Sequence, residues 1–158
     1  MKILVSACIL GDNCKYNGGN NYDADVASYL KNHEVIKICP ELLAGMSTPR
    51  ACAELVNGVV MDAAGKDVDS AYRAAVQEAM KQVEQMDIEL AVLQSRSPTC
   101  GVNSIYDGSF SGKLIKGQGL FAQALVKAGC QVIDVSDFKA KIQAADRADY
   151  EKHKGEIK

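Results

Sequence analysis

The chain has 158 residues, of which 18 are basic and 20 acidic, and its formal net charge is −2. This length suits one domain with a sizeable buried core, and the near balance of charge gives no electrostatic reason to expect nucleic acid or an anionic membrane surface as a partner of this chain alone. No apolar stretch approaches the ~20 residues that span a bilayer, and the start of the chain lacks signal-peptide features, so the sequence predicts a cytoplasmic protein.

The first half of the chain alternates short apolar runs with helix and loop signals. The pattern predicts strands at 2–6 and 35–38, which flank a polar loop and a short helix from about Asp23. The segment CPELLAGMSTPR is broken by Gly and Pro and predicts an irregular loop with at most one helical turn. The dipeptide Asn57-Gly58 then predicts a hairpin turn.

The second half continues this alternation and contains the clearest helix. Apolar residues recur at three- and four-residue steps over 69–86. A strand at 89–93 and a Gly-rich loop or hairpin follow, then a helix at 120–127 that ends near a glycine. A strand at 131–135 precedes a final helix, for which Ser136 is the expected N-cap.

Alternation of strands and helices is typical of a mostly parallel sheet covered on both faces. The sequence therefore predicts an α/β fold, with a single three-layer α/β/α domain over residues 1–150 that is Rossmann-like or flavodoxin-like. Residues 151–158 are predicted to form a charged C-terminal tail.

Four of the six cysteines lie in turn-rich segments. Cys8, Cys39 and Cys100 each follow an apolar run that is typical of a buried strand, and Cys14 lies in the polar loop after the first strand. Side chains just past the carboxyl ends of parallel strands converge on one crevice, so we expect these thiols to meet in space. Thiolates gathered in this way hold a soft metal or an iron–sulfur cluster, or act as nucleophiles.

Structural interpretations of the cysteines remain open beside the chemical one. Cys8 taken alone is well explained as a small buried apolar residue, and its spacing to Cys14 does not match the C-x2-C pattern of zinc sites. Cys52 and Cys130 are interpreted as structural. The sequence contains neither a G-x-G-x-x-G nor a Walker A motif, which leaves dinucleotide and P-loop interpretations without support.

Three polar residues near these cysteines are candidates for chemistry. Glu41 lies close enough to Cys39 to serve as a general acid or base, unless it is a solvated loop glutamate. Ser97 precedes Pro98, which favours an extended conformation, and is placed to bond a carboxylate or a substrate, unless it only caps its own turn. Arg50 is a candidate to orient a carboxylate or bind an anion, with an ordinary surface arginine as the alternative.

Taken in order, the segments SACILGDNCKYNGG, ICPELLAGMSTPR, SRSPTCG and IYDGSFSGKLIKGQG resemble the signatures of the bacterial thiouracil desulfidase family. The resemblance covers the chain up to about Val135. It implies a compact α/β domain with a [4Fe-4S] cluster bound by three cysteines. It also implies non-redox removal of sulfur from a thiolated pyrimidine, which converts thiouracil to uracil and sulfide.

The same resemblance assigns roles to individual residues. It implies Cys8, Cys39 and Cys100 as cluster and metal ligands, with Cys14 as a fourth cysteine that could exchange roles with Cys8. Thr99 stands where a serine is commoner in the family.

The implied mechanism uses an iron that has no protein ligand, because three thiolates leave one position of the cluster open for the substrate sulfur. Glu41 matches the acid/base carboxylate of the family and Ser97 its helper. Glu41, hydrogen-bonded to Ser97, is then expected to activate a water molecule.

Two other functions are consistent with the cysteines. A non-catalytic zinc or iron–sulfur binding module is the alternative, because four thiolates can close a tetrahedral zinc site. Metal-free thiol redox catalysis has the absence of a C-x-x-C pair against it. The sequence leaves open the physiological substrate, whether a free base, a nucleoside or thiolated RNA, and the oligomeric state.

Overall fold

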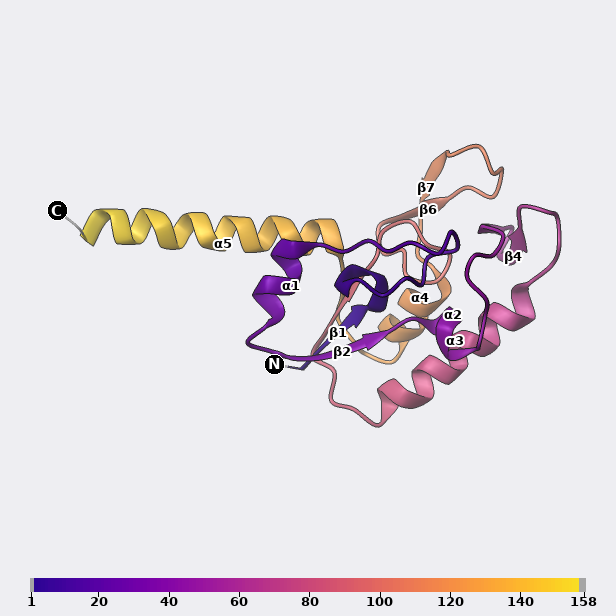
Figure 1. The fold of residues 1–158 in the computed structure, drawn as a ribbon, viewed down its shortest axis with the longest axis horizontal. Helices are drawn as coiled ribbons and strands as arrows, with labels where there is room; N and C mark the ends of the chain where they lie inside the picture. The colour runs from indigo at the N-terminus through magenta and orange to yellow at the C-terminus, as the bar shows by residue number, and fades with distance from the viewer. Residues whose placement is uncertain (1, 157–158) are drawn as a thin grey trace.

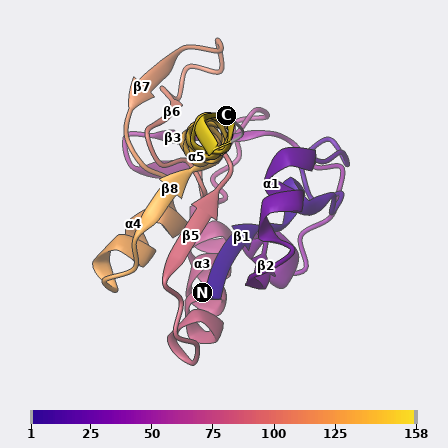
Figure 2. The same cartoon turned by 90° about the vertical axis from the view of Figure 1, so that its left-hand side faces the viewer.

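The computed structural model describes residues 2–156, with side chains described from Lys2 to residue 145. Its centre is a four-stranded sheet of order β2-β1-β5-β8. The strands are β1 (Lys2–Ser6), β2 (Glu34–Ile38), β5 (Leu90–Leu93) and β8 (Val132–Asp134). All three pairings are parallel, and the four strands lie side by side in Figure 2. The predicted α/β class with a parallel sheet is confirmed.

Helices cover both faces of this sheet (Figure 1). The helices α3 (Asp69–Glu84) and α4 (Leu120–Lys127) share one buried cluster, and α1 (Ala24–Leu30) and α5 (Val135–Glu156) share the other. The three-layer α/β/α arrangement is thus confirmed.

The sequence of β1 shows how two buried clusters arise from one sheet. Leu4 packs with α3 and α4, whereas its neighbours Ile3 and Val5 pack with α1 and α5. Successive side chains of a strand point to opposite faces, so the continuous apolar run of this strand serves both layers. All three residues are at most 1% exposed.

The residues that begin and end the helices are in most places those that the sequence predicted. The Asp23 carboxylate accepts hydrogen bonds from the backbone N–H groups of Asp25 and Val26 and so begins α1. The prediction of Ser136 as the N-cap of the last helix was wrong. Asp134 takes that role, because its Oδ1 accepts from the Ser136 N–H at 2.9 Å, one residue after α5 begins.

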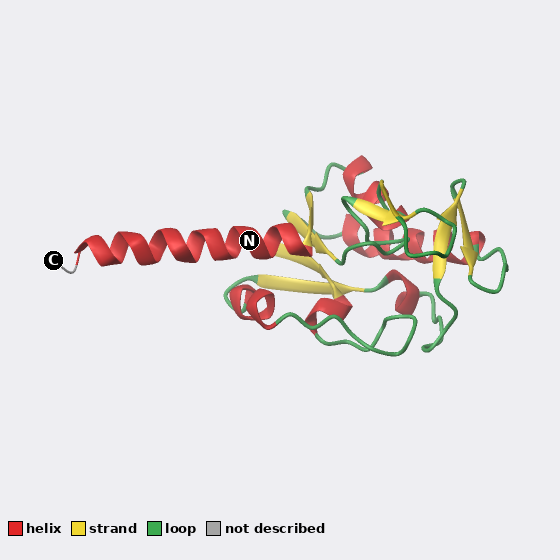
Figure 3. Cartoon of the chain, turned by 90° about the horizontal axis from the view of Figure 1, so that it is seen from above, coloured by secondary structure: helices red, strands yellow, loops and turns green. Residues whose placement is uncertain are grey.

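The helix α5 extends away from the rest of the protein as a long arm (Figure 3). It runs from Val135 to Glu156 and so passes through residue 150, where the sequence predicted a boundary between domain and tail. That boundary stays a prediction, and residues 157–158 of the predicted tail lie outside the described residues. None of the helices within residues 2–156 combines the length and apolar character needed to cross a bilayer.

Two β-hairpins and a one-turn helix lie beyond the carboxyl edge of the sheet. The helix is α2 (Pro40–Leu43). The first hairpin pairs β3 (Ala53–Val56) with β4 (Val59–Asp62), and the second pairs β6 (Ser104–Tyr106) with β7 (Leu114–Lys116). The predicted single turn of helix and the first predicted hairpin are confirmed. The Gly-rich segment forms the second hairpin, one of the two outcomes expected for it.

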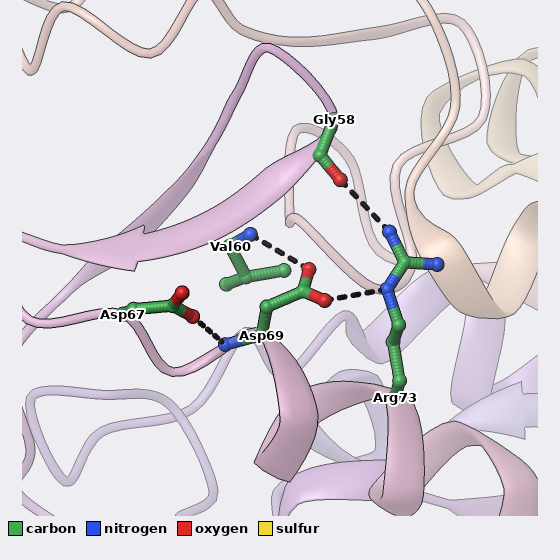
Figure 4. A network of polar contacts seen from close by, with 5 residues as sticks. All are labelled: Gly58, Val60, Asp67, Asp69 and Arg73. Carbon is green, nitrogen blue, oxygen red and sulfur yellow. Dashed lines mark hydrogen bonds and ion pairs between the residues drawn. The ribbon is translucent and has the colours of Figure 1, made fainter.

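The first hairpin is fixed to the start of α3 by a network of polar contacts (Figure 4). The Asp69 carboxylate accepts from the Val60 N–H at 2.9 Å and from Arg73 Nε at 2.7 Å. Arg73 also donates to the Gly58 carbonyl at 2.8 Å, and the Asp69 N–H donates to Asp67 at 2.9 Å. These bonds hold the first hairpin in place relative to α3.

Candidate functional site

The cavity of interest lies where the strand order reverses. The chain passes from β2 across β1 to β5, and in open α/β sheets ligands bind outside the carboxyl ends of the strands at such a point. A cavity of about 750 Å3 occupies this place. Its walls include four thiols, a carboxylate and two hydroxyls, from Cys8, Cys14, Cys39, Cys100, Glu41, Ser97 and Thr99. We call it the thiol cavity.

Each strand end delivers one cysteine to the thiol cavity. Cys8 lies in a short 3-10 helix, Ala7–Leu10, that begins directly after β1. Cys39 precedes α2, where Pro40 at the first turn is compatible with the missing N–H donor. Cys100 follows the Ser97–Thr99 turn after β5 and is 6% exposed. The structure therefore brings together thiols that lie up to 92 positions apart (8 to 100).

Cys14 links the other two thiols of the first half of the chain. Hydrogen bonding from the Cys14 thiol lowers the pKa of Cys8 to about 7, with a further contribution from Asn21, whose Nδ2 lies 3.5 Å from the Cys8 sulfur. Hydrogen bonding to Cys39 and then to Cys8 raises the pKa of Cys14 itself. The Cys8 thiol therefore ionises more readily than the Cys14 thiol.

Cys100 has a different environment. Its burial raises the pKa of the thiol, and the charge of Glu41 acts in the same direction. The hydroxyl oxygen of Thr99 lies 3.8 Å from the Cys100 sulfur. A buried thiol of this kind becomes a thiolate when a metal replaces its proton.

Glu41 is a buried carboxylate, 6% exposed, with partners on both oxygens. Thr99 Oγ1 donates to Glu41 Oε1 at 2.8 Å, and the Cys39 thiol donates to Oε2 at 3.3 Å. The interpretation of Glu41 as a solvated loop residue is therefore wrong. A charged group this buried is held by hydrogen bonds.

Ser97 does not contact Glu41 directly, because Thr99 lies between the two side chains. Its hydroxyl is 2.8 Å from Thr99 Oγ1, and no bond from Ser97 to Glu41 is present among the described residues. Ser97 Oγ also accepts from the N–H groups of Thr99 and Cys100 at 3.1 and 3.2 Å. Ser97 therefore caps its own turn, whereas the expected direct bond to Glu41 is wrong, because the Thr99 hydroxyl lies between them.

The start of α4 is hydrogen-bonded to the Ser97–Thr99 turn and holds it in place. The N–H groups of Leu120 and Phe121 donate to the carbonyls of Pro98 and Thr99 at 2.8 and 2.9 Å. Gly119 lies so close that a Cβ there would come within 2.5 Å of the Thr99 carbonyl. A glycine is required at this position by close packing.

Arg50 and Cys52 also line the thiol cavity. Arg50 Nη2 donates to the Cys14 carbonyl at 3.1 Å, while its buried Nε has no partner among the described residues. Arg50 is thus not an ordinary surface arginine. The structural interpretation of Cys52 did not foresee its place in the cavity wall, whereas Cys130 lies before β8, away from the cavity.

Glu54, Tyr72 and Phe110 are among the residues of the cavity wall that sequence reasoning missed. Tyr72 is buried on α3, and its burial and then the charge of Glu41 raise its pKa. The helical periodicity of α3 identified Tyr72 as a core residue but gave no indication of its second role. For Glu54 and Phe110 no motif or spacing provides a signal.

The thiols of the cavity are the donors that a metal centre would use. Across the part of the chain that the structure describes, no three His, Cys, Asp or Glu side chains are arranged to hold a single metal ion. A tetrahedral zinc site needs such convergence. In an iron–sulfur cluster the thiolates bind different irons and stand around the cavity instead. Four cysteine thiols around one cavity are a donor set that fits an iron–sulfur cluster.

Comparison with known proteins agrees with this site. The family model for 2-thiouracil desulfurase matches residues 3–137. The uncharacterized protein YbbK of Bacillus subtilis (strain 168) is 34% identical over an alignment of 145 residues, and the match covers 85% of this chain and 96% of that protein. The solved structure of the [4Fe-4S]-dependent thiouracil desulfidase TudS matches with a TM-score of 0.81 and 30% identity, covering 93% of this chain and 98% of that one. The chain belongs to the 2-thiouracil desulfurase family.

Proposed function

We propose that this protein is a [4Fe-4S]-dependent desulfidase that converts thiouracil, or a related thiolated pyrimidine, to uracil and sulfide. The observation that carries the proposal is the thiol cavity, in which four cysteines from three strand ends surround a buried, hydrogen-bonded carboxylate. Membership of the 2-thiouracil desulfurase family and the match to TudS support the same activity.

The residues that would hold the cluster are Cys8, Cys39 and Cys100, one from each strand end. Cys14 contacts the thiols of Cys8 and Cys39 and is the candidate to replace Cys8. Three thiolates would leave one iron of a bound cluster without a protein ligand, and that iron would be a soft Lewis acid able to polarise the carbon–sulfur bond of the substrate.

Glu41 is proposed as the general base. Its Oε1 is fixed by Thr99, and its Oε2 accepts from the Cys39 thiol. As a cluster ligand, Cys39 would be a thiolate with no proton to donate, and Oε2 of Glu41 would be free to accept a proton from water. The hydroxyl of Ser97 holds Thr99 and so assists Glu41 through it.

The reaction balances without electron transfer. Water provides the oxygen that replaces sulfur on the pyrimidine carbon, and Glu41 accepts the proton that water loses. The departing sulfur takes both protons of that water, one of them returned by Glu41, and leaves as hydrogen sulfide. The net change is hydrolysis of a carbon–sulfur bond.

The size of the thiol cavity and the state of the cysteines support proposals on the kind of substrate and on the cellular compartment of the protein. The cavity volume of about 750 Å3 is in the range of small-molecule sites, and all the residues used here come from one chain. The proposed substrate is therefore a small thiolated pyrimidine, and nucleic acid is not required. All six cysteines are free thiols, which suits the reducing cytoplasm proposed for this protein.

Anaerobic reconstitution followed by analysis of iron, acid-labile sulfide and zinc tests the proposal. The protein should be brown, contain about four iron and four sulfide per chain, and release uracil from 2-thiouracil. Glu41→Gln should retain the iron and lose turnover, whereas Cys130→Ser, a control outside the cavity, should retain both. Stoichiometric zinc without sulfide would favour the binding module and overturn the desulfidase assignment.

A further inference from the structure

Phe110 has an unusual backbone conformation. It lies in the loop between β6 and β7 and has a φ of 57°, in the left-handed region. Bulky residues rarely adopt this region, and such strain persists only where the surrounding structure imposes it. Strained residues of this kind are concentrated at ligand sites.

A buried carboxylate imposes this conformation. Glu54 of β3 is 8% exposed, and its Oε1 accepts from the N–H groups of Gly108 and Phe110 at 3.0 and 3.2 Å. No ion pair to Glu54 is present within the described residues. The charge of Glu54 is therefore held by the loop it anchors, through charge-assisted hydrogen bonds.

Close packing and internal bonds fix the rest of the loop. A Cβ on Gly108, which has a φ of 91°, would lie 2.7 Å from the Leu55 carbonyl, so the loop lies directly against β3. Asp107 Oδ1 accepts from the Ser109 N–H at 2.9 Å. The loop is thus held firmly on the N-terminal side of Phe110.

The ring of Phe110 is not used for core packing. Phe110 belongs to neither buried cluster and is 37% exposed. It lines the thiol cavity, as does Glu54, together with Glu41 and the four cysteines. A large apolar ring held in a strained conformation at this wall has no structural purpose that the fold reveals, but it suits contact with a flat ligand.

We propose, building on the desulfidase function, that Phe110 provides a stacking face for the pyrimidine ring of the substrate, and that Glu54 is the positioning residue that fixes Phe110. The site then selects planar heteroaromatic thiones over saturated ones. Stacking of a base on an aromatic side chain contributes substantially to binding and tolerates ring substituents. Phe110 acts on binding and not on the chemical step.

Steady-state kinetics with 2-thiouracil and 5,6-dihydro-2-thiouracil test this inference, together with calorimetric binding of uracil to the reconstituted protein. Phe110→Leu should raise KM for 2-thiouracil and Kd for uracil by about 5- to 50-fold, with kcat little changed. Phe110→Tyr keeps the ring and should resemble the parent. The saturated dihydro compound should discriminate far less between the parent and Phe110→Leu.

Variants of Glu54 separate positioning from direct contact. Glu54→Gln retains a carbonyl oxygen for both loop N–H groups and should resemble the parent. Glu54→Ala should raise KM as Phe110→Leu does, and the double variant should add little, because both changes remove the same stacking face. If Glu54→Ala does not fold, Glu54→Gln and the Phe110 variants decide the question.

Unchanged KM and Kd in Phe110→Leu would overturn the inference even if the parent turns over 2-thiouracil normally. Additive effects in the double variant, or equal loss in Glu54→Gln and Glu54→Ala, would overturn the positioning role of Glu54. Failure of the desulfidase function would show separately, as absence of turnover in the parent. In that case uracil binding still decides whether Phe110 contacts a pyrimidine.

Discussion

Thr99 Oγ1 donates a 2.8 Å hydrogen bond to Glu41 Oε1 and so joins two segments that are 58 residues apart in the chain. Thr99 is 1% exposed and Glu41 6%, so no solvent competes for the bond. Hydrogen bonds to charged groups contribute about 1.5–3 kcal/mol. This bond therefore fixes the proposed base relative to the turn that carries Cys100.

Replacement of Thr99 by valine removes the hydroxyl and keeps the shape of the side chain. We expect Thr99→Val to lower kcat by about 10- to 100-fold, because Glu41 loses its donor and its orientation. Thr99→Ser retains a hydroxyl and should restore most of the activity. Both variants should bind as much iron as the parent, measured on anaerobically reconstituted protein.

Loss of iron in Thr99→Val, in proportion to lost activity, would show that Thr99 supports the cysteines and not Glu41. Equal activity of the valine and serine variants would show that the hydroxyl is not needed. Ser97→Ala should have a smaller effect than Thr99→Val, since Ser97 reaches Glu41 only through Thr99.

The sequence was sufficient to predict the sheet and the place of the site. Short apolar runs such as those of β1, β2 and β5 are typical of buried strands, and the periodicity of α3 is typical of an amphipathic helix. Strand ends in a parallel sheet meet at one edge. The convergence of Cys8, Cys39 and Cys100 follows from that rule alone. Glu41 and Ser97 were candidates from their positions near the cysteines, and the family resemblance added their roles but not the geometry between them.

The remaining features depend on contacts that leave no trace in local sequence. Thr99 was noted only as a departure from the usual serine, because nothing in SPTC shows which hydroxyl points to Glu41. Glu54 resembles any polar residue of an alternating strand until the second hairpin packs on it. Ser136 has the residue type of an N-cap, but Asp134, two positions earlier, takes that role.

Cysteine variants should divide into two groups by their iron content. Cys39→Ser and Cys100→Ser should lose most of the iron and sulfide, because each removes one thiolate of the proposed cluster. Cys52→Ser should retain both, although Cys52 lines the same cavity. Between Cys8→Ser and Cys14→Ser, the variant with less iron identifies the third ligand. Full iron in both Cys39→Ser and Cys100→Ser would contradict the ligand set.

Gly119→Ala should disturb the turn that carries Thr99 and Cys100. The new Cβ would lie 2.5 Å from the Thr99 carbonyl, a distance that forces α4 or the turn to move. We expect a loss of about 2 kcal/mol or more in unfolding free energy, or about 4 °C or more in Tm, with reduced kcat. Gly117→Ala is the matched control, since its Cβ would meet only the Ile105 side chain, at 3.3 Å. Equal stability of the two variants would show that α4 yields without cost.

The network at the start of α3 should make part of the stability depend on pH. Hydrogen bonds from Arg73 and from the Val60 N–H hold the pKa of Asp69 below its usual value of 3.8. A carboxyl with a lowered pKa in the folded state stabilises the protein above its unfolded pKa, and this contribution is lost as the pH falls through the folded pKa. Asp69→Asn should therefore be less stable than the parent at pH 7, with a smaller difference at pH 2.

Urea unfolding of both proteins between pH 7 and pH 2 measures this difference. Because the Arg73 side chain is 51% exposed, its share is expected to be modest, about 0.5–1 kcal/mol for Arg73→Gln at pH 7. Arg73→Lys keeps the charge but not the two-sided contact to Asp69 and Gly58, so it should recover only part of the loss. A stability difference between parent and Asp69→Asn that stays constant from pH 7 to pH 2 would contradict the role assigned to the ionised carboxylate.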